Sequence, residues 1–219
     1  MPLPQRVRWL APERLRNSER LRSVALGAGL IPPRPMHTPA EAAVLRRLAS
    51  DRRRVLEIGT YEGSSAVVLA AAMPVDGVLH LLDSYEGNAL LFGWQGTERA
   101  SRRLLARATP ARGGPQVRWH VARSLDVARG WSEPLEMVFI DAGHTEPEAR
   151  ADWEAWSPHV VPGGIVAFHD ARAGHQGGGH TWPGPTAVVD DLFRGEAALA
   201  GWRLAEEVDS VVVVQRSPS

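Results

Sequence analysis

The sequence predicts a doubly wound α/β fold, in which a mostly parallel sheet of seven strands carries helices on both faces. Short apolar runs alternate with segments of helical character along most of the 219 residues. The runs are almost continuously apolar, as is typical of strands that are buried on both faces. The last two runs are separated only by a short turn, so we expect them to form an antiparallel hairpin at one edge of the sheet.

Two helices are expected before the first strand. Residues 12–29 place apolar side chains among charged ones at helical spacing, and a proline-rich connector follows at 31–37. The second helix is expected from about 38 to 50, because Thr38 and Glu41 have the spacing of a capping box.

The remaining elements follow in alternation. We expect strands at 55–59, 78–83, 117–122, 135–141, 164–170, 202–208 and 209–216. We expect helices at 65–73, 97–107, 124–129, 147–157 and 186–195. Ligands in open α/β sheets bind outside the carboxyl ends of the strands, so functional residues are expected just after each parallel run.

The composition is that of an ordinary globular domain, with 44% hydrophobic and 23% charged residues, and it excludes general disorder. A chain of this length suits a single core. The absence of cysteine excludes a disulfide framework, a thiolate metal site and a cysteine nucleophile. All 25 basic residues are Arg, so no lysine base or Schiff-base chemistry is available.

The charge is unevenly distributed along the chain, although it sums to zero. Residues 1–54 hold twelve Arg and four acids, whereas residues 55–219 hold thirteen Arg and twenty-one acids. An acidic body argues against nucleic acid as a partner, and the Arg-rich start is interpreted as a solvated or inter-subunit face of a homo-oligomer. No apolar run approaches the roughly 18 residues of a membrane span, and the first residues lack the apolar region of a signal peptide. We therefore expect a cytoplasmic protein that is not associated with membranes.

A glycine turn follows the first strand. Gly59 and Gly63 let the chain turn tightly into the next helix, whose N-terminus favours a carboxylate or phosphate. Asp83 ends the second strand, where an acid can accept hydrogen bonds from both ribose hydroxyls. The dinucleotide pattern G-x-G-x-x-G is missing, which favours S-adenosylmethionine over NAD, with Glu57 suited to its ammonium group. The alternatives are a surface turn acid at Asp83 and a helix-capping carboxylate at Glu57.

Three further polar residues end the fourth and fifth strands. Asp141, His169 and Asp170 offer two carboxylates and one imidazole, a set that suits Mg²⁺ first, with Mn²⁺ or non-haem iron as alternatives. An isolated Asp or His after a strand is more often a turn residue. Three such residues at adjacent strand ends would be costly to bury without a metal or a charged partner, which favours a divalent cation.

Three stretches of the sequence resemble one known family. They are VLEIGTYEGSS at 55–65, LLDSYEG at 81–87, and MVFIDAGHTEPEARADWEAWSPHVVPGGIVAFHD at 137–170. They are similar to class I S-adenosylmethionine-dependent methyltransferases, and specifically to the cation-dependent small-molecule O-methyltransferases of the macrolide-sugar and cephamycin-type branch. The resemblance covers roughly residues 36–215.

The resemblance implies a Rossmann-like methyltransferase fold, with an S-adenosylmethionine-binding catalytic domain at 51–219 and a helical arm at 1–50. It places Asp83 at the ribose and the turn at 122–124 beside the adenine. It also places Asp141, His169 and Asp170 at the metal-ligand positions, although His169 stands where members usually carry Asp or Glu. The cofactor-binding residues expected from the resemblance and from the glycine turn are Glu57, Gly59, Tyr61, Gly63, Ser65, Asp83, Ser124 and Asp141.

His144 is the candidate general base for a hydroxylated small-molecule acceptor of the natural-product or sugar type. It lies three residues beyond Asp141, no Lys or Cys exists, and the neighbouring carboxylates would be committed to the cation. The alternative is that His144 only caps the helix that follows. For the function, the alternatives are a C- or N-methyltransferase acting on a metal-chelating acceptor, a non-catalytic nucleotide- or cofactor-binding protein, and a nucleotide-linked dehydrogenase on a similar sheet. Acceptor contacts are expected from the loops, with these candidates: His175, His180, Trp94 and Trp182.

Overall fold

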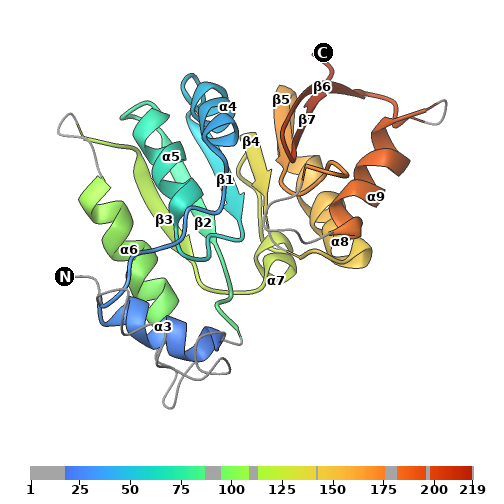
Figure 1. The fold of residues 1–219 in the computed structure, drawn as a ribbon. Helices are drawn as coiled ribbons and strands as arrows, with labels where there is room; N and C mark the ends of the chain where they lie inside the picture. Colours follow the sequence, from blue (N-terminus) through green and yellow to red (C-terminus); the bar gives the residue numbers. More distant parts are fainter. Residues whose placement is uncertain are drawn as a thin grey trace.

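The computed structural model describes residues 18–86, 95–108, 113–141, 143–175, 182–195 and 198–218. They form a seven-stranded sheet with the strand order β3-β2-β1-β4-β5-β7-β6 (Figure 1). The strands are β1 Arg54–Ile58, β2 Val78–Leu82, β3 Gln116–His120, β4 Leu135–Ile140, β5 Val160–Phe168, β6 Trp202–Val208 and β7 Val211–Arg216. The first five strands run parallel to one another, whereas β7 runs antiparallel to both β5 and β6. The predicted fold class and the terminal hairpin are therefore confirmed.

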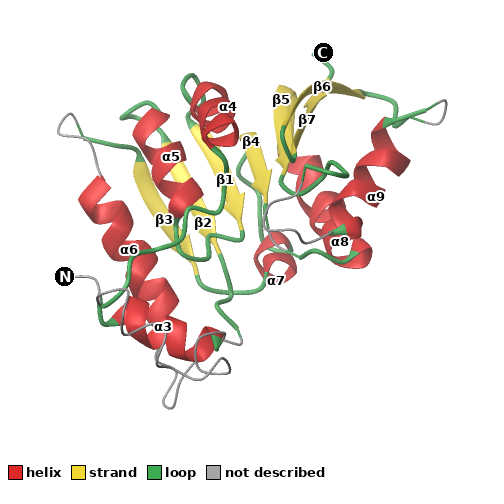
Figure 2. Ribbon diagram, viewed as in Figure 1, coloured by secondary structure: helices red, strands yellow, loops and turns green. Residues whose placement is uncertain are grey.

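Helices cover both faces of the sheet (Figure 2). One face packs against α4 and α5, with α6 beside them, and the other packs against α8 and α9, with α7 at its margin. The short α3 packs on α6. The helices are α3 Glu19–Gly27, α4 Pro39–Ala49, α5 Ser64–Ala72, α6 Gly96–Ala108, α7 Ser124–Ala128, α8 Glu146–Trp156 and α9 Pro183–Phe193, with a 3₁₀ turn at Ser157–His159.

Alternation along each strand produces two cores. In β1, Val55 faces the α4–α5 side and Leu56 faces the α8–α9 side, and both are fully buried. In β7, Val213 and Val214 divide between the two cores in the same way. Strands buried on both faces account for the continuous apolar runs in the sequence.

The helix starts follow the signals in the sequence. Thr38 and Glu41 form the predicted capping box, and the helix begins at Pro39. The predicted last helix begins three residues earlier than expected, because Pro183 and Pro185 are tolerated in a first helical turn. The first helix begins at Glu19, and the part of its expected range before residue 18 lies outside the described residues.

The strand β1 lies inside the sheet, with β2 on one side and β4 on the other, and the site is expected at the carboxyl end of this strand. The chain leaves β1 toward β2 and later returns to β4, so the strand order reverses at this point. Crevices at such a reversal are where open α/β sheets bind ligands. The carboxyl ends of β1, β2, β4 and β5 all open there.

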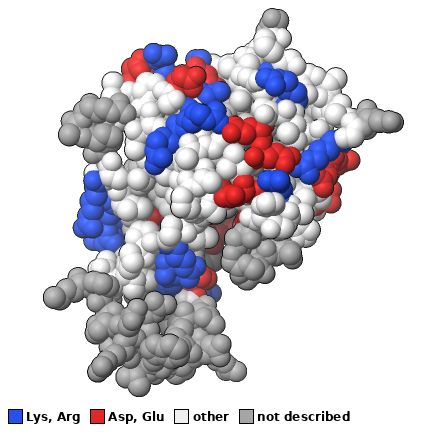
Figure 3. Space-filling model, turned by 45° about the horizontal axis from the view of Figure 1, so that its top comes forward, with Lys and Arg blue, Asp and Glu red and all other residues white. Residues whose placement is uncertain are grey.

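Opposite charges are interspersed on the surface. On the face drawn in Figure 3, Arg and acidic side chains lie next to each other over much of the charged area. The described ion pairs include Arg54 with Glu136 and Arg194 with Glu207. Among the residues that the structure describes, no helix is both long and apolar enough to span a membrane.

Candidate active site

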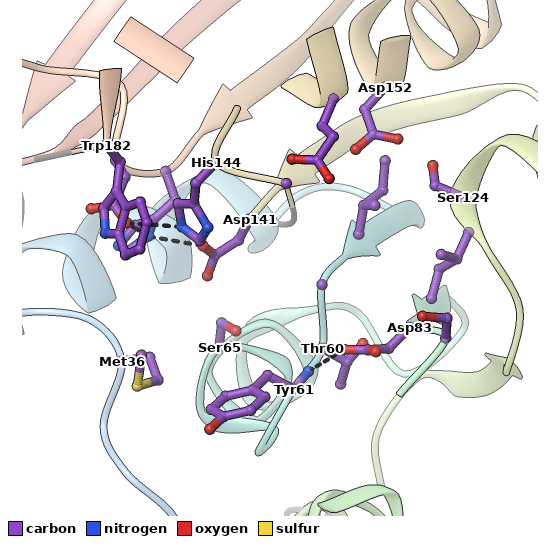
Figure 4. Close-up of a pocket in the computed structure, with 18 of the residues that line it drawn as sticks. Met36, Thr60, Tyr61, Ser65, Asp83, Ser124, Asp141, His144, Asp152 and Trp182 are labelled. Carbon is purple, nitrogen blue, oxygen red and sulfur yellow. Dashed lines mark hydrogen bonds and ion pairs between the residues drawn. The ribbon is translucent and has the colours of Figure 1, made fainter. Parts of the chain in front are cut away.

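A cavity of about 1340 Å³ opens at the carboxyl ends of the parallel strands (Figure 4). Its wall comes from the ends of β1, β2, β4 and β5, from the starts of α4 and α7, and from α8. Pockets for one small ligand usually measure about 300–1,000 Å³, so this cavity has room for two molecules side by side.

The glycine turn after β1 forms one side of the cavity. Gly63 has a φ of 87°, and a Cβ there would lie 2.9 Å from the Cβ of Ser101, so glycine is required on two grounds. Gly59 also has a positive φ of 92°, and between them Tyr61 adopts a left-handed φ of 45°. The turn thus brings backbone N–H groups and the α5 N-terminus to the cavity, as the sequence predicts.

Asp83 joins the ends of β1 and β2. Its Oδ2 accepts a hydrogen bond from the Tyr61 backbone N–H at 2.7 Å, and its Oδ1 accepts one from the Tyr85 N–H at 2.6 Å. Burial nevertheless raises the pKa of Asp83 above its ordinary value. A carboxylate offers about four acceptor positions, so two remain for hydroxyl donors from a ligand.

Glu57 lies behind the turn and is fully buried. Burial raises its pKa to about 8, and the nearby carboxylates of Asp141 and Asp83 act in the same direction. The hydroxyls of Ser65 and Thr60 oppose the rise only in part. Neither carboxylate oxygen has a hydrogen-bond partner of normal geometry among the described residues. At neutral pH Glu57 is therefore mostly a neutral carboxyl group, and no cation acts on it among the described residues.

Two carboxylates and two histidines meet at the ends of β4 and β5. Asp141, His144 and Asp170 each place one ligand atom within 4.8 Å of the others. His169 also lies in this group, with its Nδ1 at 3.0 Å from Asp141 Oδ1 and 3.6 Å from Asp170 Oδ2. The three predicted metal ligands thus lie together, but the compact set of ligand atoms contains His144 in place of His169.

Both ring nitrogens of His169 face carboxylates. Its Nε2 lies 3.5 Å from Glu41 Oε2, on the side opposite Asp141. Burial alone would lower the pKa of His169, but Asp141, Glu41 and Asp170 outweigh it and raise the pKa to about 11. This ring is therefore held as a cation between acids.

Glu41 has a second role beyond the capping box. It is buried and accepts hydrogen bonds from the Thr38 N–H at 2.8 Å and from the Ser210 hydroxyl at 2.6 Å. Burial would raise its pKa, but His169 and these hydrogen bonds lower it to about 2. Glu41 thereby links the start of α4, the β6–β7 turn and the end of β5.

His144 is held by its neighbours on three sides. Its Nε2 lies 3.3 Å from Asp170 Oδ2, and its ring packs on Trp182 with centroids 4.3 Å apart. Behind it, Gly184 at the start of α9 packs on the backbone of this loop, and a Cβ there would lie 2.4 Å from the His144 carbonyl oxygen. The helix after it is capped by Thr145 rather than by His144.

Most of the predicted site residues line one cavity. Its lining includes Gly59, Tyr61, Ser65, Asp83, Ser124, Asp141, His144, His169 and Asp170. Glu57 and Gly63 lie behind this lining. Trp182 also lines the cavity, while His175 does not, and His180 and Trp94 lie outside the described residues.

Sequence reasoning missed several lining residues, namely Met36, Thr38, Glu41, Asp152 and Ser210. Thr38 and Glu41 are recognised in the sequence only as a helix cap. Asp152 lies in the middle of α8, and Ser210 in a hairpin turn, so neither follows a parallel strand. No local signal marks them, because tertiary packing brings them to the cavity.

Similarity to known proteins agrees with this geometry. The family model described as a methyltransferase domain matches residues 56–171. The chain belongs to the methyltransferase family. A protein named "Putative O-methyltransferase" from Mycobacteroides abscessus is 30% identical over 173 residues, which are 77% of this chain and 71% of that protein. The uncharacterized protein y4gI from Sinorhizobium fredii is 25% identical over 130 residues, but the match spans only 14% of its length.

Solved structures share the fold of this methyltransferase. The O-methyltransferase TomG from Streptomyces achromogenes, involved in tomaymycin synthesis and solved in complex with SAM, superposes with a TM-score of 0.64. It is 21% identical in sequence, and the match covers 99% of this chain and 100% of TomG. The predicted class of enzyme, an O-methyltransferase, is confirmed at the level of the family by the methyltransferase model and the relative that is 30% identical, and TomG shows that a protein of this fold binds SAM.

Proposed function

We propose that this methyltransferase transfers the methyl group of S-adenosylmethionine to a hydroxyl group of a small natural-product or sugar-like acceptor. One observation carries the proposal: a single cavity joins a cradle for an adenosyl amino acid to a pair of acidic side chains. The cradle comprises Glu57, the glycine turn and Asp83, and the acidic pair is Asp141 and Asp170.

The cradle suits the cofactor group by group. The buried carboxylate of Glu57 is the partner for the α-ammonium group, while the turn from Gly59 to Ser65 and the α5 N-terminus suit the carboxylate. Asp83 keeps acceptor positions for the ribose hydroxyls, and Ser124 stands where the adenine would lie. TomG, which shares this fold, was solved with SAM bound.

The acidic pair suits a divalent cation. Asp141 and Asp170 provide carboxylate oxygens, and Mg²⁺ in proteins is usually held by one or two carboxylates together with waters and substrate oxygens. His169 completes the predicted ligand set, but its two nitrogens already face Asp141 and Glu41. When bound, a divalent cation acts as a Lewis acid that makes an acceptor hydroxyl easier to deprotonate.

His144 is the general base of the proposed reaction. Asp170 faces its Nε2, which orients the ring and leaves Nδ1 to take the proton. The acceptor oxygen forms a bond to the methyl carbon while the carbon–sulfur bond breaks, the hydroxyl proton passes to His144, and S-adenosylhomocysteine leaves. Holding the two reactants in line supplies much of the acceleration.

The proposal extends to the organisation of the protein. Residues 51–219 form the catalytic unit, residues 1–50 form a helical arm, and the enzyme acts in the cytoplasm as a homo-oligomer, without nucleic acid or membrane partners. The absence of cysteine in the sequence and the acidic body support the compartment and the choice of a small-molecule acceptor.

The metal dependence is tested without knowledge of the acceptor. Calorimetry should show Mn²⁺ binding to the EDTA-treated protein, and Asp141→Asn and Asp170→Asn should each weaken it by at least about tenfold, since each removes a charged ligand. Asp126→Asn is the matched control, because Asp126 lies at the cavity rim in an ion pair with Arg129. A screen of hydroxylated compounds for methylated products should then show turnover that EDTA abolishes and Mg²⁺ or Mn²⁺ restores. Unchanged Mn²⁺ binding in both variants, or full turnover in excess EDTA, contradicts the metal site.

A further inference from the structure

Asp152 is a buried acid in the cavity to which neither the cofactor cradle nor the metal pair assigns a role. It lies in the middle of α8, is only 6% exposed, and lines the cavity. Burial is the largest influence on it and raises its pKa to about 6. The described groups that act on it are Ser124 and Glu148, and neither is a cation. At neutral pH Asp152 is therefore a carboxylate acceptor without a charged donor.

The Asp152 carboxylate lies beside the Ser124 hydroxyl and can still accept further hydrogen bonds. The Ser124 hydroxyl accepts a hydrogen bond from Trp156 Nε1 at 2.7 Å, so its own hydrogen is free to donate. Ser124 acts on the Asp152 carboxylate and lowers its pKa, which offsets part of the rise that burial causes. Since the hydroxyl supplies one donor and a carboxylate accepts about four hydrogen bonds, Asp152 can still accept from a ligand.

The surroundings of Asp152 suit a flat heterocycle. Leu125 on α7 lines the same cavity and is 41% exposed, and Ile58 and Leu82 line it from the ends of β1 and β2. In Figure 4, Asp152 and Ser124 lie together at one end of the cavity, with Asp83 on the same side, while His144 and Trp182 lie at the other end. A nucleoside whose ribose contacts Asp83 would direct its base toward this apolar end of the cavity, where Asp152 lies.

We infer that Asp152 selects the base of the cofactor by accepting a hydrogen bond from the exocyclic amino group of adenine. The inference rests on the proposed cofactor. Adenine presents an amino donor at this position, whereas hypoxanthine presents a carbonyl oxygen that would face the carboxylate. A buried acceptor left against another acceptor loses its hydrogen bond and suffers repulsion, so discrimination between the two bases is expected to be strong.

The test compares S-adenosylhomocysteine with S-inosylhomocysteine by calorimetry. Wild-type protein should bind the adenine ligand at least about tenfold more tightly than the inosine ligand. In Asp152→Asn the side-chain amide can donate to the carbonyl, so the preference should fall to within a few-fold or reverse. Glu57→Gln is the matched control: it should weaken both ligands by the same factor and leave the preference intact.

The outcomes separate a role in base selection from a structural one. If Asp152→Asn weakens both ligands equally, Asp152 only ties α8 to α7 and the inference is wrong. Equal affinities of wild-type protein for the adenine and inosine ligands also overturn the inference. This measurement does not depend on the folding of any variant. If wild-type protein binds neither ligand, the cofactor proposal itself fails, which distinguishes the two failures.

Discussion

Replacing Glu57 by Gln should change how the stability of the unliganded protein depends on pH. Glu57 is fully buried, and its pKa rises from 4.5 to about 8 in the folded chain. Ionising it in place therefore costs on the order of 5 kcal/mol relative to the unfolded chain. That is comparable with the whole stability of many small domains, about 5–15 kcal/mol.

The sign follows from which state binds the proton more tightly. Below about pH 4.5 the carboxyl is protonated in both states and Glu57 carries no ionisation cost. Between 4.5 and about 8 the folded protein keeps a proton that the unfolded chain has lost, so stability falls as the pH rises. Above about 8 the full cost is present. The Gln amide stays neutral at every pH, so the free energy of unfolding of the variant lacks this contribution to the pH dependence.

Urea unfolding between pH 5 and 9, in EDTA, measures the effect. The free energy of unfolding of Glu57→Gln minus that of wild type should increase by several kcal/mol from the acid to the alkaline end. The comparison uses the change with pH, because the buried amide has a pH-independent cost of its own. S-adenosylhomocysteine should bind wild type more tightly as the pH rises toward 8, whereas binding to the variant should be weak and should lack this dependence. Parallel pH profiles for the two proteins would refute the assignment of Glu57 as a neutral group awaiting a cation.

Two further predictions concern the other site residues. Asp83→Ala should weaken S-adenosylhomocysteine binding by more than about tenfold, or 1.4 kcal/mol, because the ribose acceptors and the tie to Tyr61 are both lost; calorimetry with equal affinities would exclude this contact. His144→Gln should reduce turnover by about 10²–10⁴-fold while Mn²⁺ affinity stays within a few-fold of wild type. Loss of Mn²⁺ binding instead would identify His144 as a ligand, and near-normal turnover would exclude it as the base.

The fold was predictable because its signals are local. Apolar runs, the capping box at Thr38 and the short turn before β7 each depend on residues close together in the chain, and each is found in the structure. The placement of site residues at the strand ends follows from the parallel topology. Exact bounds were less predictable: β5 begins at Val160 rather than 164, because the Pro-Gly-Gly segment continues the strand through an irregular register against β4.

Pairings between distant residues were not predictable. Glu41 meets Ser210 across 169 positions, and this contact brings a capping residue to within 3.5 Å of His169. The role of His169 depends on that neighbour, because an imidazole between two carboxylates keeps its proton, whereas one beside a metal does not. Asp152 is similar: its position in a helix suggests an exposed acid, and only the packing of α8 on α7 buries it in the cavity.

The concentration of acids at this edge explains why positively charged ligands suit it. Glu57, Asp83, Asp141 and Asp170 gather where the strand order reverses, and each added negative charge raises the cost of ionising the next. The protein offsets part of this cost itself, by protonating Glu57 and by keeping His169 as a cation. The ammonium and sulfonium groups of S-adenosylmethionine and a divalent cation would offset the rest. Methyl transfer removes the sulfonium charge, so the product S-adenosylhomocysteine is attracted to the acids less strongly than the substrate, which favours its exchange for a new cofactor molecule.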